Sequence, residues 1–367
     1  MPNPPKIYVT VTNDLNQDQR MHRTCDTLTQ AGYRVILVGR KLTNSKELPS
    51  FDFEIQRLRC IFNKGVAFYL EYNLRLFLYL LFCQFNAILA CDTDTILPGL
   101  LVSKIKRKPC IHDAHEYFSE VPELQNSPLK KKIWDKLAAW AIPQCKAVYT
   151  VGPQLAQILG ERYKTPFASI RNVPNIKNRL TPHPTRPVLL YQGALNQGRG
   201  LEQMLKAIAE IDNVELWIAG TGDIETKLHH LTSQLNLTGK VKFLGFVMPE
   251  DLTQLTENAY IGINLLDNNS PSYYYSLANK FFDYIMAEIP SINMNFPEYQ
   301  HINKENQVAI LIDNLEKETI KQAIIELISN AQLYEKIVNN CIESKKNNNW
   351  QKEEAKLIDI WKKVVPL

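Results

Sequence analysis

Short apolar segments rich in β-branched residues alternate with amphipathic segments from one end of the chain to the other. Seven apolar segments precede residue 180 and six follow it, and YRVILVG (33–39) and VELWIAG (214–220) are typical. Runs that are apolar on both faces suit parallel strands, which the connecting helices cover on both sides. The alternation therefore predicts an α/β chain of two doubly wound, Rossmann-like domains.

The chain is long enough for about two domains, and one segment suggests where the first of them ends. TPHPTRP (181–187) holds three prolines directly before a new apolar segment, a composition typical of linkers. We therefore expect domains over 1–180 and 181–345. The amphipathic segment WQKEEAKLIDIWKKVVPL ends the sequence, and we expect 346–367 to form a helix that packs back on the first domain.

Charge and cysteine usage indicate a compartment and exclude some partners. A formal net charge of +4 does not indicate a nucleic-acid partner, although it would suit an anionic substrate or membrane surface. No cysteine belongs to a C-x-x-C pair and no signal-peptide pattern precedes the first predicted strand, so we expect a cytoplasmic protein. The seven cysteines are Cys25, Cys60, Cys83, Cys91, Cys110, Cys145 and Cys341.

Two segments of the first domain bear on membrane contact. The longest apolar region, 66–85, is interrupted by Glu71 and Arg75 and is too short to span a bilayer, so we expect a buried or interfacial helix. The segment SPLKKKIWDKLAAWAI (127–142) mixes three consecutive lysines with two tryptophans, as helices that dock on anionic membranes do. Docking would place the protein at the inner face of the membrane, and ordinary packing of both helices is the alternative.

The loop after the first strand of the second domain has the features of an anion-binding site. Ligands of open α/β sheets bind beyond the carboxyl ends of the strands, and two facing domains would leave a central cleft between those ends. Gly193, Gly198 and Gly200 would let the backbone approach a ligand closely, ahead of a helix N-terminus that favours anions. Arg199 adds a fixed positive charge. A flexible loop with a solvated arginine is the alternative.

The segment YSLANKFFDYIMAEIP predicts a helix with a second anion-binding pattern. Asn279, Lys280 and Asp283 fall within an arc of about 100°. Backbone amides near Ser276 and Leu277 would open the helix, and a lysine one turn in suits a phosphate group. The Asp283 carboxylate would then accept hydrogen bonds from the two hydroxyls of a ribose. A salt bridge between Lys280 and Asp283 on a surface is the alternative.

Polar clusters also follow two strands of the first domain. The strand PCIHDA leads into HEYFSE, where His115 and Glu116 would project from the strand end beside Asp113. No second histidine stands at i+4, which argues against a zincin-type metal site. A structural role is the alternative for His115. For the loop after the first strand, the alternative is that Asn13 or Asp14 caps the helix that follows. The loop after the first strand contains three charged residues, which are Asp14, Asp18 and Arg20.

With these motifs in place, the chain resembles the retaining glycosyltransferases of family 4, of GT-B architecture, over nearly its whole length. The family opens its second domain with a G-x-x-x-x-x-K/R-G loop, here GALNQGRG, and continues with a G-x-G strand end, here IAGTGD. A segment that borders the nucleobase follows, here VKFLGFVMPEDL with Val247. One branch carries Asn-Lys before the second acid of the donor motif, and YSLANKFFDYIMAEIPSI and ACDTDTILPGLLVSK…CIHDAHEYFSE are similar to that branch.

The chain departs from the family pattern at three positions. Tyr275 stands where the family has the first acid of its donor motif, and Asp283 replaces the usual Glu at the second. Ala194 replaces an Arg that often precedes the Lys/Arg-Gly pair. These changes bear on the affinity for the donor and on its identity, while we expect the architecture to be unaffected.

The resemblance implies a GT-B fold with an acceptor domain, 1–180, and a nucleotide-sugar donor domain, 181–345. It implies a hexosyltransferase-type enzyme that moves a sugar from a nucleotide-diphosphate sugar to a polysaccharide, lipid-linked or similar acceptor with retention. No cofactor or metal is expected, because the protein supplies the positive field itself. The catalytic residues would be His115, Arg199 and Lys280. The acceptor side would comprise Asp14, Asp18, Arg20 and Glu116. The nucleotide diphosphate would contact Gly193, Gly198, Gly200, Val247, Ser276, Leu277, Asn279 and Asp283.

Two other functions remain open at the level of the sequence. A nucleotide-sugar epimerase of the same fold would need carboxylates around the sugar ring, and Asp113, Glu116 and Glu120 are available. A catalytically silent nucleotide-sugar-binding protein is favoured by Tyr275 and Ala194, because both replace side chains that the family uses at the donor site.

Overall fold

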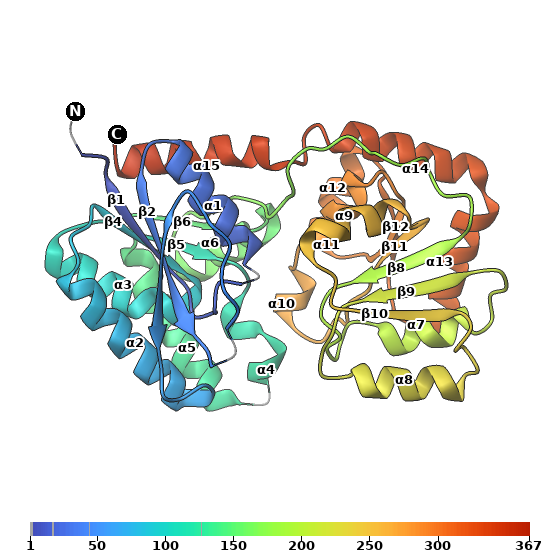
Figure 1. Ribbon diagram of the computed structural model, residues 1–367, viewed down its shortest axis with the longest axis horizontal. Helices are drawn as coiled ribbons and strands as arrows, with labels where there is room; N and C mark the ends of the chain where they lie inside the picture. Colours follow the sequence, from blue (N-terminus) through green and yellow to red (C-terminus); the bar gives the residue numbers. More distant parts are fainter. Residues whose placement is uncertain (1–2, 17, 44, 126) are drawn as a thin grey trace. The chain divides into compact units, whose positions relative to one another are not determined.

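The computed structural model describes residues 3–16, 18–43, 45–125 and 127–367, which form two compact units (Figure 1). The first unit comprises Met1–Asn172 and Glu353–Leu367, and the second comprises Val173–Lys352. Each unit is built on one parallel sheet with helices between successive strands. The predicted class, two doubly wound α/β domains, is confirmed.

The chain enters the second unit after Asn172, earlier than the predicted boundary at residue 180, and the proline-rich segment 181–187 belongs to the second unit. Hydrogen bonds explain this difference. The guanidinium group of Arg179 donates to the carbonyl oxygens of Ala287 and Glu257, and the Glu257 carboxylate accepts from the N–H group of Thr181 at 3.2 Å. A segment bonded this closely to one unit is part of it rather than a linker.

Within the described residues, the sheet of the first unit has seven parallel strands in the order β3-β2-β1-β4-β5-β6-β7. Every residue of β4 and β5 is buried, as expected for central strands covered on both faces. The strands are β1 (Lys6–Thr10), β2 (Arg34–Lys41), β3 (Glu54–Arg59), β4 (Ala87–Cys91), β5 (Cys110–Ala114), β6 (Ala147–Thr150) and β7 (Ala168–Ser169). The helices are α1 (Gln19–Gln30), α2 (Gly65–Phe82), α3 (Asp92–Lys106), η1 (Phe118–Glu120), α4 (Pro122–Gln125), α5 (Pro128–Ala141), η2 (Ile142–Gln144) and α6 (Pro153–Tyr163).

The second unit repeats this design with six parallel strands among the described residues, in the order β10-β9-β8-β11-β12-β13. The strands are β8 (Val188–Gln192), β9 (Glu215–Ala219), β10 (Val241–Gly245), β11 (Ile261–Asn264), β12 (Ser291–Met294) and β13 (Ala309–Ile312). The helices are α7 (Leu201–Ile208), α8 (Glu225–Gln234), α9 (Pro249–Glu257), α10 (Pro271–Tyr274), α11 (Asn279–Met286), α12 (Pro297–Glu305), α13 (Lys317–Ser329) and α14 (Ala331–Ser344).

Each sheet has one point where the order of strand addition reverses, between β1 and β4 in the first unit and between β8 and β11 in the second. Loops diverge at the carboxyl edge there, which is where sheets of this kind bind ligands. In the second unit, α11 packs directly on this point. The Tyr284 hydroxyl contacts the carbonyl oxygens of Leu190 and Ile263 at 3.0 and 3.1 Å, and a Cβ on Gly262 would lie 2.3 Å from the Tyr284 ring.

The last helix, α15 (Trp350–Val364), begins in the second unit, and its residues from Glu353 onward belong to the first. Trp361 is fully buried, with its ring centroid 6.0 Å from that of Tyr33. The Tyr33 hydroxyl donates to the carbonyl oxygen of Val365 at 2.7 Å. The fully buried Glu353 carboxylate forms an ion pair with Arg171 at 2.7 Å. The C-terminal helix is therefore part of the core of the first unit.

The apolar region that includes α2 forms a helix of eighteen residues. One side of the helix is buried in a core cluster of the first unit. Its buried residues are spaced four apart and are Phe68, Tyr72, Leu76 and Leu80. In the described part of the chain, no helix has both the length and the apolar content needed to cross a bilayer.

Candidate functional site

The loop between β8 and α7 takes backbone conformations that favour glycine. Gly193, Gly198 and Gly200 have φ angles of +132°, +82° and +65°, and Gly200 precedes the first residue of α7. A Cβ on Gly200 would lie 2.6 Å from that of Leu265, which follows β11. The loop thus lies against the end of β11, at the point where strand order reverses.

Arg199 is held in this loop with part of its hydrogen-bonding capacity unused. Its guanidinium carbon lies 5.2 Å from the centroid of the Tyr273 ring, a cation–π distance. The Nε atom is buried and has no hydrogen-bond partner among the described residues. A buried donor without an acceptor costs free energy, so this geometry suits an anion that brings the missing acceptor.

Lys280, in the first turn of α11, is a buried cation at the same edge of the sheet. The residue is 8% exposed, and its Nζ atom lies 3.8 Å from the centroid of the Tyr191 ring. A Cβ on Gly193 would lie 3.3 Å from this Nζ atom. Burial, and then the charge of Arg199, lower the pKa of Lys280 well below its usual value, although Asp283 acts in the opposite direction.

No carboxylate forms a salt bridge with Lys280 in the part of the chain that the structure describes. A buried ammonium group without a counter-ion is costly unless a ligand supplies the negative charge. Lys280 and Arg199 are close enough for one charge to depress the pKa of the other. The two side chains and the glycines of the β8–α7 loop therefore form a cationic site that suits an anion.

The predicted opening of α11 is corrected by the structure. The helix begins at Asn279, with Ala278 as its N-cap, so Ser276 and Leu277 precede it. The Tyr299 hydroxyl, 3.1 Å away, accepts a hydrogen bond from the Ala278 N–H group, and the Ser276 hydroxyl donates to the carbonyl oxygen of Tyr273. Asn279 is exposed. The amides that open the helix are those from Asn279 onward.

Asp283, one turn further along α11, is half-buried and oriented by a neighbour. The Gln192 side-chain amide donates to its carboxylate at 2.8 Å, and the oxygen of the same amide accepts from the Thr256 hydroxyl at 2.9 Å. Val247, after β10, is also half-buried and packs against the core cluster that contains Leu190. These contacts leave the carboxylate at the carboxyl end of β8, on the helix that carries Lys280.

The first unit has a second polar cluster, at the carboxyl ends of β4 and β5. The His115 N–H group donates to the Asp92 carboxylate at 2.8 Å, and the His115 ring nitrogens lie 3.4 Å from Asp92 and 3.3 Å from Asp113. Burial disfavours the charged ring, but the two carboxylates outweigh it and raise the pKa of His115 to about 9. The ring is therefore an imidazolium at neutral pH.

Asp113 is fully buried and bound by Arg20. The guanidinium group of Arg20 donates to both carboxylate oxygens, at 3.0 and 2.7 Å, and to the carbonyl oxygen of Ile170 at 2.9 Å. Burial acts to raise the pKa of Asp113, but Arg20 and His115 hold it well below its usual range. Arg20 is itself only 4% exposed, so its visible role is to neutralise Asp113 rather than to reach solvent.

The other residues predicted for the acceptor side have local roles. Asp18, rather than Asn13 or Asp14, caps α1, because its carboxylate accepts a hydrogen bond from the Met21 N–H group at 3.1 Å. Asp14 accepts a hydrogen bond from the Asn16 side chain at 2.7 Å. Glu116 is exposed, one residue after His115.

Sequence reasoning did not single out two acids that the structure places in the His115 cluster. Asp92 opens α3 with a φ angle of +54°. Asp94 accepts a hydrogen bond from the Thr12 hydroxyl at 2.6 Å, and burial and the Asp92 charge raise its pKa to about 7. Their position in the sequence could have identified both acids, because they directly follow β4, the strand that pairs with β1 where the strand order reverses.

Three potential metal ligands meet in this cluster. Ligand atoms of Cys91, Asp113 and His115 lie within 4.8 Å of one another. Arg20 already occupies both oxygens of Asp113, and burial raises the pKa of the Cys91 thiol far above its usual value. A cation would have to compete with the positive charges of Arg20 and His115, so the donor set does not favour a metal.

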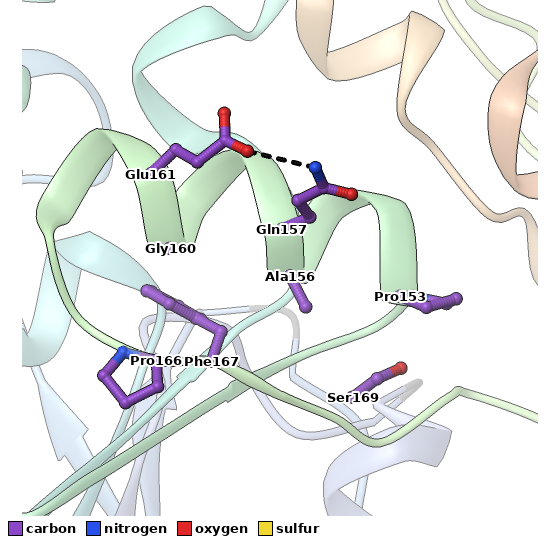
Figure 2. A pocket seen from close by; sticks show the side chains of 8 residues that line it. All are labelled: Pro153, Ala156, Gln157, Gly160, Glu161, Pro166, Phe167 and Ser169. Atoms are coloured by element: carbon purple, nitrogen blue, oxygen red, sulfur yellow. Dashed lines mark hydrogen bonds between the residues drawn. The ribbon is translucent and has the colours of Figure 1, made fainter.

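A shallow cavity of about 490 Å³ lies elsewhere in the first unit, around α6 (Figure 2). Pro153, Ala156 and Gly160 contribute from the helix, and Phe167 and Ser169 from the segment that contains β7. Glu161 and Gln157 hydrogen-bond to each other on the helix at 3.0 Å. None of the predicted site residues lines this cavity.

Two protein-family models match adjoining parts of the chain. Residues 18–176 match Glycosyltransferase Family 4, and residues 172–344 match Glycosyl transferases group 1. An uncharacterized glycosyltransferase of Methanocaldococcus jannaschii is 28% identical over 156 residues, which are 42% of this chain and 38% of that protein. The match thus spans well under half the length of this curated relative.

Solved structures share the fold over nearly the whole chain. Sucrose-phosphate synthase from Thermosynechococcus elongatus superposes with a TM-score of 0.81 at 15% identity, covering 98% of each chain. HepE from Anabaena, solved in complex with UDP and glucose, superposes with a TM-score of 0.78 at 14% identity, covering 98% of this chain and all of that one. At these identities the likeness establishes the fold, which is that of GT-B glycosyltransferases.

Proposed function

We propose that this chain, whose residues 18–176 match Glycosyltransferase Family 4 and whose residues 172–344 match Glycosyl transferases group 1, is a glycosyltransferase of GT-B fold. Its donor is a nucleotide-diphosphate sugar. Its acceptor is a saccharide, either a polysaccharide or a lipid-linked one, and the sugar is a hexose transferred with retention of configuration. The observation that carries this proposal is the buried Lys280 side chain, which lies beside Arg199 and forms no salt bridge with a described residue.

This cationic site suits the diphosphate of the donor. Breaking the bond between the anomeric carbon and the diphosphate leaves an electron pair on the leaving phosphate oxygen. Lys280, Arg199 and the opening amides of α11 would stabilise that charge, and they are in place before it develops. Because α11 begins at Asn279, Lys280 lies in the first helical turn, where the helix dipole adds to its charge.

The nucleoside would be bound one turn further along the same helix. The Asp283 carboxylate is oriented by Gln192 and would accept hydrogen bonds from the ribose hydroxyls. Val247 would border the base, as the family resemblance implies. A diphosphate site and a diol site one helical turn apart match the two polar parts of a nucleoside diphosphate.

In the first unit, His115 and Asp92 are the groups that we assign to the transferred sugar. The charged ring of His115 would place positive charge beside the sugar, and the Asp92 carboxylate would accept hydrogen bonds from the hydroxyls of the sugar. We propose that the acceptor hydroxyl oxygen bonds to the anomeric carbon on the side that the diphosphate leaves. Its proton then passes to the leaving phosphate oxygen, which balances the step without a protein nucleophile.

The proposal assigns no step to a metal ion, because Lys280 and Arg199 supply the positive charge. We expect turnover to be unchanged by EDTA. We also propose that the protein works in the cytoplasm, at the inner face of the membrane. All seven cysteines are free, which suits a reducing compartment.

A non-catalytic nucleotide-sugar-binding protein is the second candidate. It is favoured by Tyr275, which stands in place of an acid and packs edge-on against Tyr274 with ring centroids 5.0 Å apart. Turnover distinguishes the two candidates, because a binding protein would retain the donor without forming either a free nucleotide or a new glycoside. Conversion of the bound donor without an acceptor would indicate an epimerase instead.

The decisive experiment is a thermal-shift panel with UDP, GDP, ADP and TDP. A ligand that binds only the folded protein raises its Tm according to concentration and affinity. We expect one nucleotide to stand out, Lys280→Ala to abolish its shift and Arg199→Ala to weaken it. Lys206→Ala, on an exposed position of α7, is the matched control. If both site variants respond like the parent protein, the diphosphate site is wrong.

A further inference from the structure

The outward side of α2 carries a row of large apolar side chains that no described residue covers. Val66, Leu70, Leu74, Leu78 and Phe82 follow one another at four-residue spacing and are 59%, 69%, 59%, 45% and 84% exposed. The opposite side of the helix packs its own four-residue row in the core. We call the exposed row the α2 stripe. Neither the diphosphate site nor the His115 cluster uses it.

The neighbouring helix α5 adds exposed apolar side chains to those of α2. The Tyr69 ring of α2 and the Trp134 ring of α5 meet edge-on, with centroids 5.3 Å apart. Along α5, Leu129, Ile133 and Trp140 are exposed and fall on one side of the helix. Each of two adjacent helices therefore exposes a row of apolar side chains to solvent. Such rows mark an interaction surface more clearly than isolated exposed apolar residues do.

Basic residues adjoin both rows. Lys106, at the end of α3, lies 5.4 Å from the Phe85 ring and donates to the Cys83 carbonyl oxygen, next to the end of α2. Lys104 lies 5.7 Å from the Trp140 ring of α5. The basic residues of this region without a carboxylate partner among the described residues are Lys104, Lys106, Arg107, Lys108, Lys130, Lys132 and Lys136.

The acidic residues of these helices are already neutralised. Glu71 forms an ion pair with Arg75, and Asp135 pairs with Arg162. Glu120, on the adjoining turn, pairs with Lys131 at 2.6 Å. Among the described residues of α2 and α5 and at the C-terminal end of α3, the charges without an oppositely charged partner are therefore all positive.

We propose that the α2 stripe and the seven basic residues dock the protein on the surface of an anionic lipid bilayer. An interfacial helix lies in the membrane plane with apolar side chains below the headgroups, and basic residues nearby bind anionic lipid. A second copy of the chain fits less well. The stripe is about 24 Å long and roughly 10 Å wide, far less than the ~800 Å² that each partner buries in a stable complex. Two such surfaces would also repel each other through their uncompensated positive charge.

The test is co-sedimentation of the full chain with vesicles of phosphatidylcholine, with and without 30% phosphatidylglycerol (a composition of roughly physiological anionic charge). We expect binding to the anionic vesicles to exceed binding to the neutral ones by at least about tenfold, and to weaken as salt is raised. The triple variant Leu70→Gln, Leu74→Gln, Leu78→Gln should lose most of this binding. The triple variant Lys130→Gln, Lys132→Gln, Lys136→Gln should lose the preference for anionic lipid.

Ile325→Gln, at an exposed position of α13 in the second unit, is the matched control and should bind vesicles like the parent. The Tm and its shift with nucleotide check that each variant is folded, and they separate this proposal from the proposed donor site. Equal sedimentation of parent and α2 stripe variant would overturn the proposal. So would dimerisation of the parent protein that the stripe variant abolishes, because the stripe would then bind a second copy.

Discussion

The ammonium group of Lys280 lies 3.8 Å from the centroid of the Tyr191 ring, inside the second unit and without a carboxylate partner among the described residues. The ring face offers partial negative charge, which replaces only part of the hydration that the lysine loses on burial. Burial of this lysine in the folded protein therefore costs stability. Such an arrangement is expected where a ligand completes the charge.

Replacing this lysine should separate stability from binding. Lys280→Met keeps most of the side-chain volume and removes the buried charge, so we expect an equal or higher free energy of unfolding at pH 6, with nucleotide binding lost. Urea denaturation and the nucleotide-induced Tm shift measure the two effects. Lys206→Met, on the exposed surface, should change stability by no more than about 0.5 kcal/mol. A destabilised Lys280→Met that still binds nucleotide would mean that the lysine is structural.

Nucleotide binding should be coupled to a proton. The pKa of Lys280 is lowered in the free protein by burial and by Arg199, and a bound diphosphate would raise it again. Above the lowered pKa, binding therefore takes up a proton, and affinity falls as pH rises towards the ordinary lysine value of about 10.4. Calorimetry in buffers of different ionisation enthalpy measures this uptake. Lys280→Arg keeps its positive charge over this pH range and should bind nucleotide without the uptake, and an unchanged uptake there would assign the proton to another group.

The stability of the first unit should depend on the charge of His115. Its pKa is about 9 in the folded protein and about 6.5 in an unfolded chain, so the charged ring binds its proton more tightly when folded. The stabilisation by the charged ring is complete below pH 6.5 and is lost as pH rises through 9. It contributes about 1–3 kcal/mol to the free energy of unfolding, after allowance for the partial exposure of the ring. His115→Gln should lose it. Urea denaturation of both proteins at pH 6 and pH 10 should show a difference at pH 6 that disappears at pH 10.

Removing Arg20 should leave a buried carboxylate without its counter-ion. Arg20→Met breaks both hydrogen bonds to Asp113, and we expect a loss of about 3–5 kcal/mol in the free energy of unfolding. The double variant Arg20→Met, Asp113→Asn should recover a large part of it, because the uncompensated charge is gone. A double-mutant cycle by urea denaturation measures the coupling. A fully stable Arg20→Met would return this residue to the acceptor role that the sequence suggested.

A methyl group on Gly220 should distort the β8–α7 loop at Gly193. Gly220 has a φ angle of +147°, and its Cβ would lie 1.9 Å from the carbonyl oxygen of Gly193. The backbone around Gly193 would have to move to make room for the methyl group. We therefore expect Gly220→Ala to lower the free energy of unfolding by about 1–3 kcal/mol or more and to weaken nucleotide binding. Gly239→Ala meets no atom within 4 Å and serves as the control. Equal Tm values for the two variants would contradict the packing described.

Most of the fold follows from local pattern. The segment VLLYQG predicts β8 (Val188–Gln192), and NAILAC predicts β4 (Ala87–Cys91), each within one residue of the observed bounds. Short runs that are apolar on both faces have few other structures open to them. Glycines in the β8–α7 loop were also recognisable, because three within eight residues before a helix indicate positive φ angles.

The parts that sequence reasoning missed depend on residues far apart in the chain. α11 begins at Asn279, later than predicted, and the N–H group of its N-cap, Ala278, is bound by the hydroxyl of Tyr299, 21 residues away. Arg20 resembles a solvent-facing residue until the fold places Asp113, 93 residues away, against it. The exposed stripe of α2 was hidden for a similar reason, since its helix is apolar on most sides and only the packing shows which side is covered.

The return of the chain from the second unit to the first has a consequence for biosynthesis. The first unit cannot complete its core while only Met1–Asn172 has left the ribosome, because Trp361 and the rest of Glu353–Leu367 are still to be translated. At roughly 5–20 residues per second, synthesis of the intervening segment takes on the order of ten seconds or more. During that interval Tyr33 and its neighbours in the nascent chain lack the Trp361 side chain that packs against them in the folded protein.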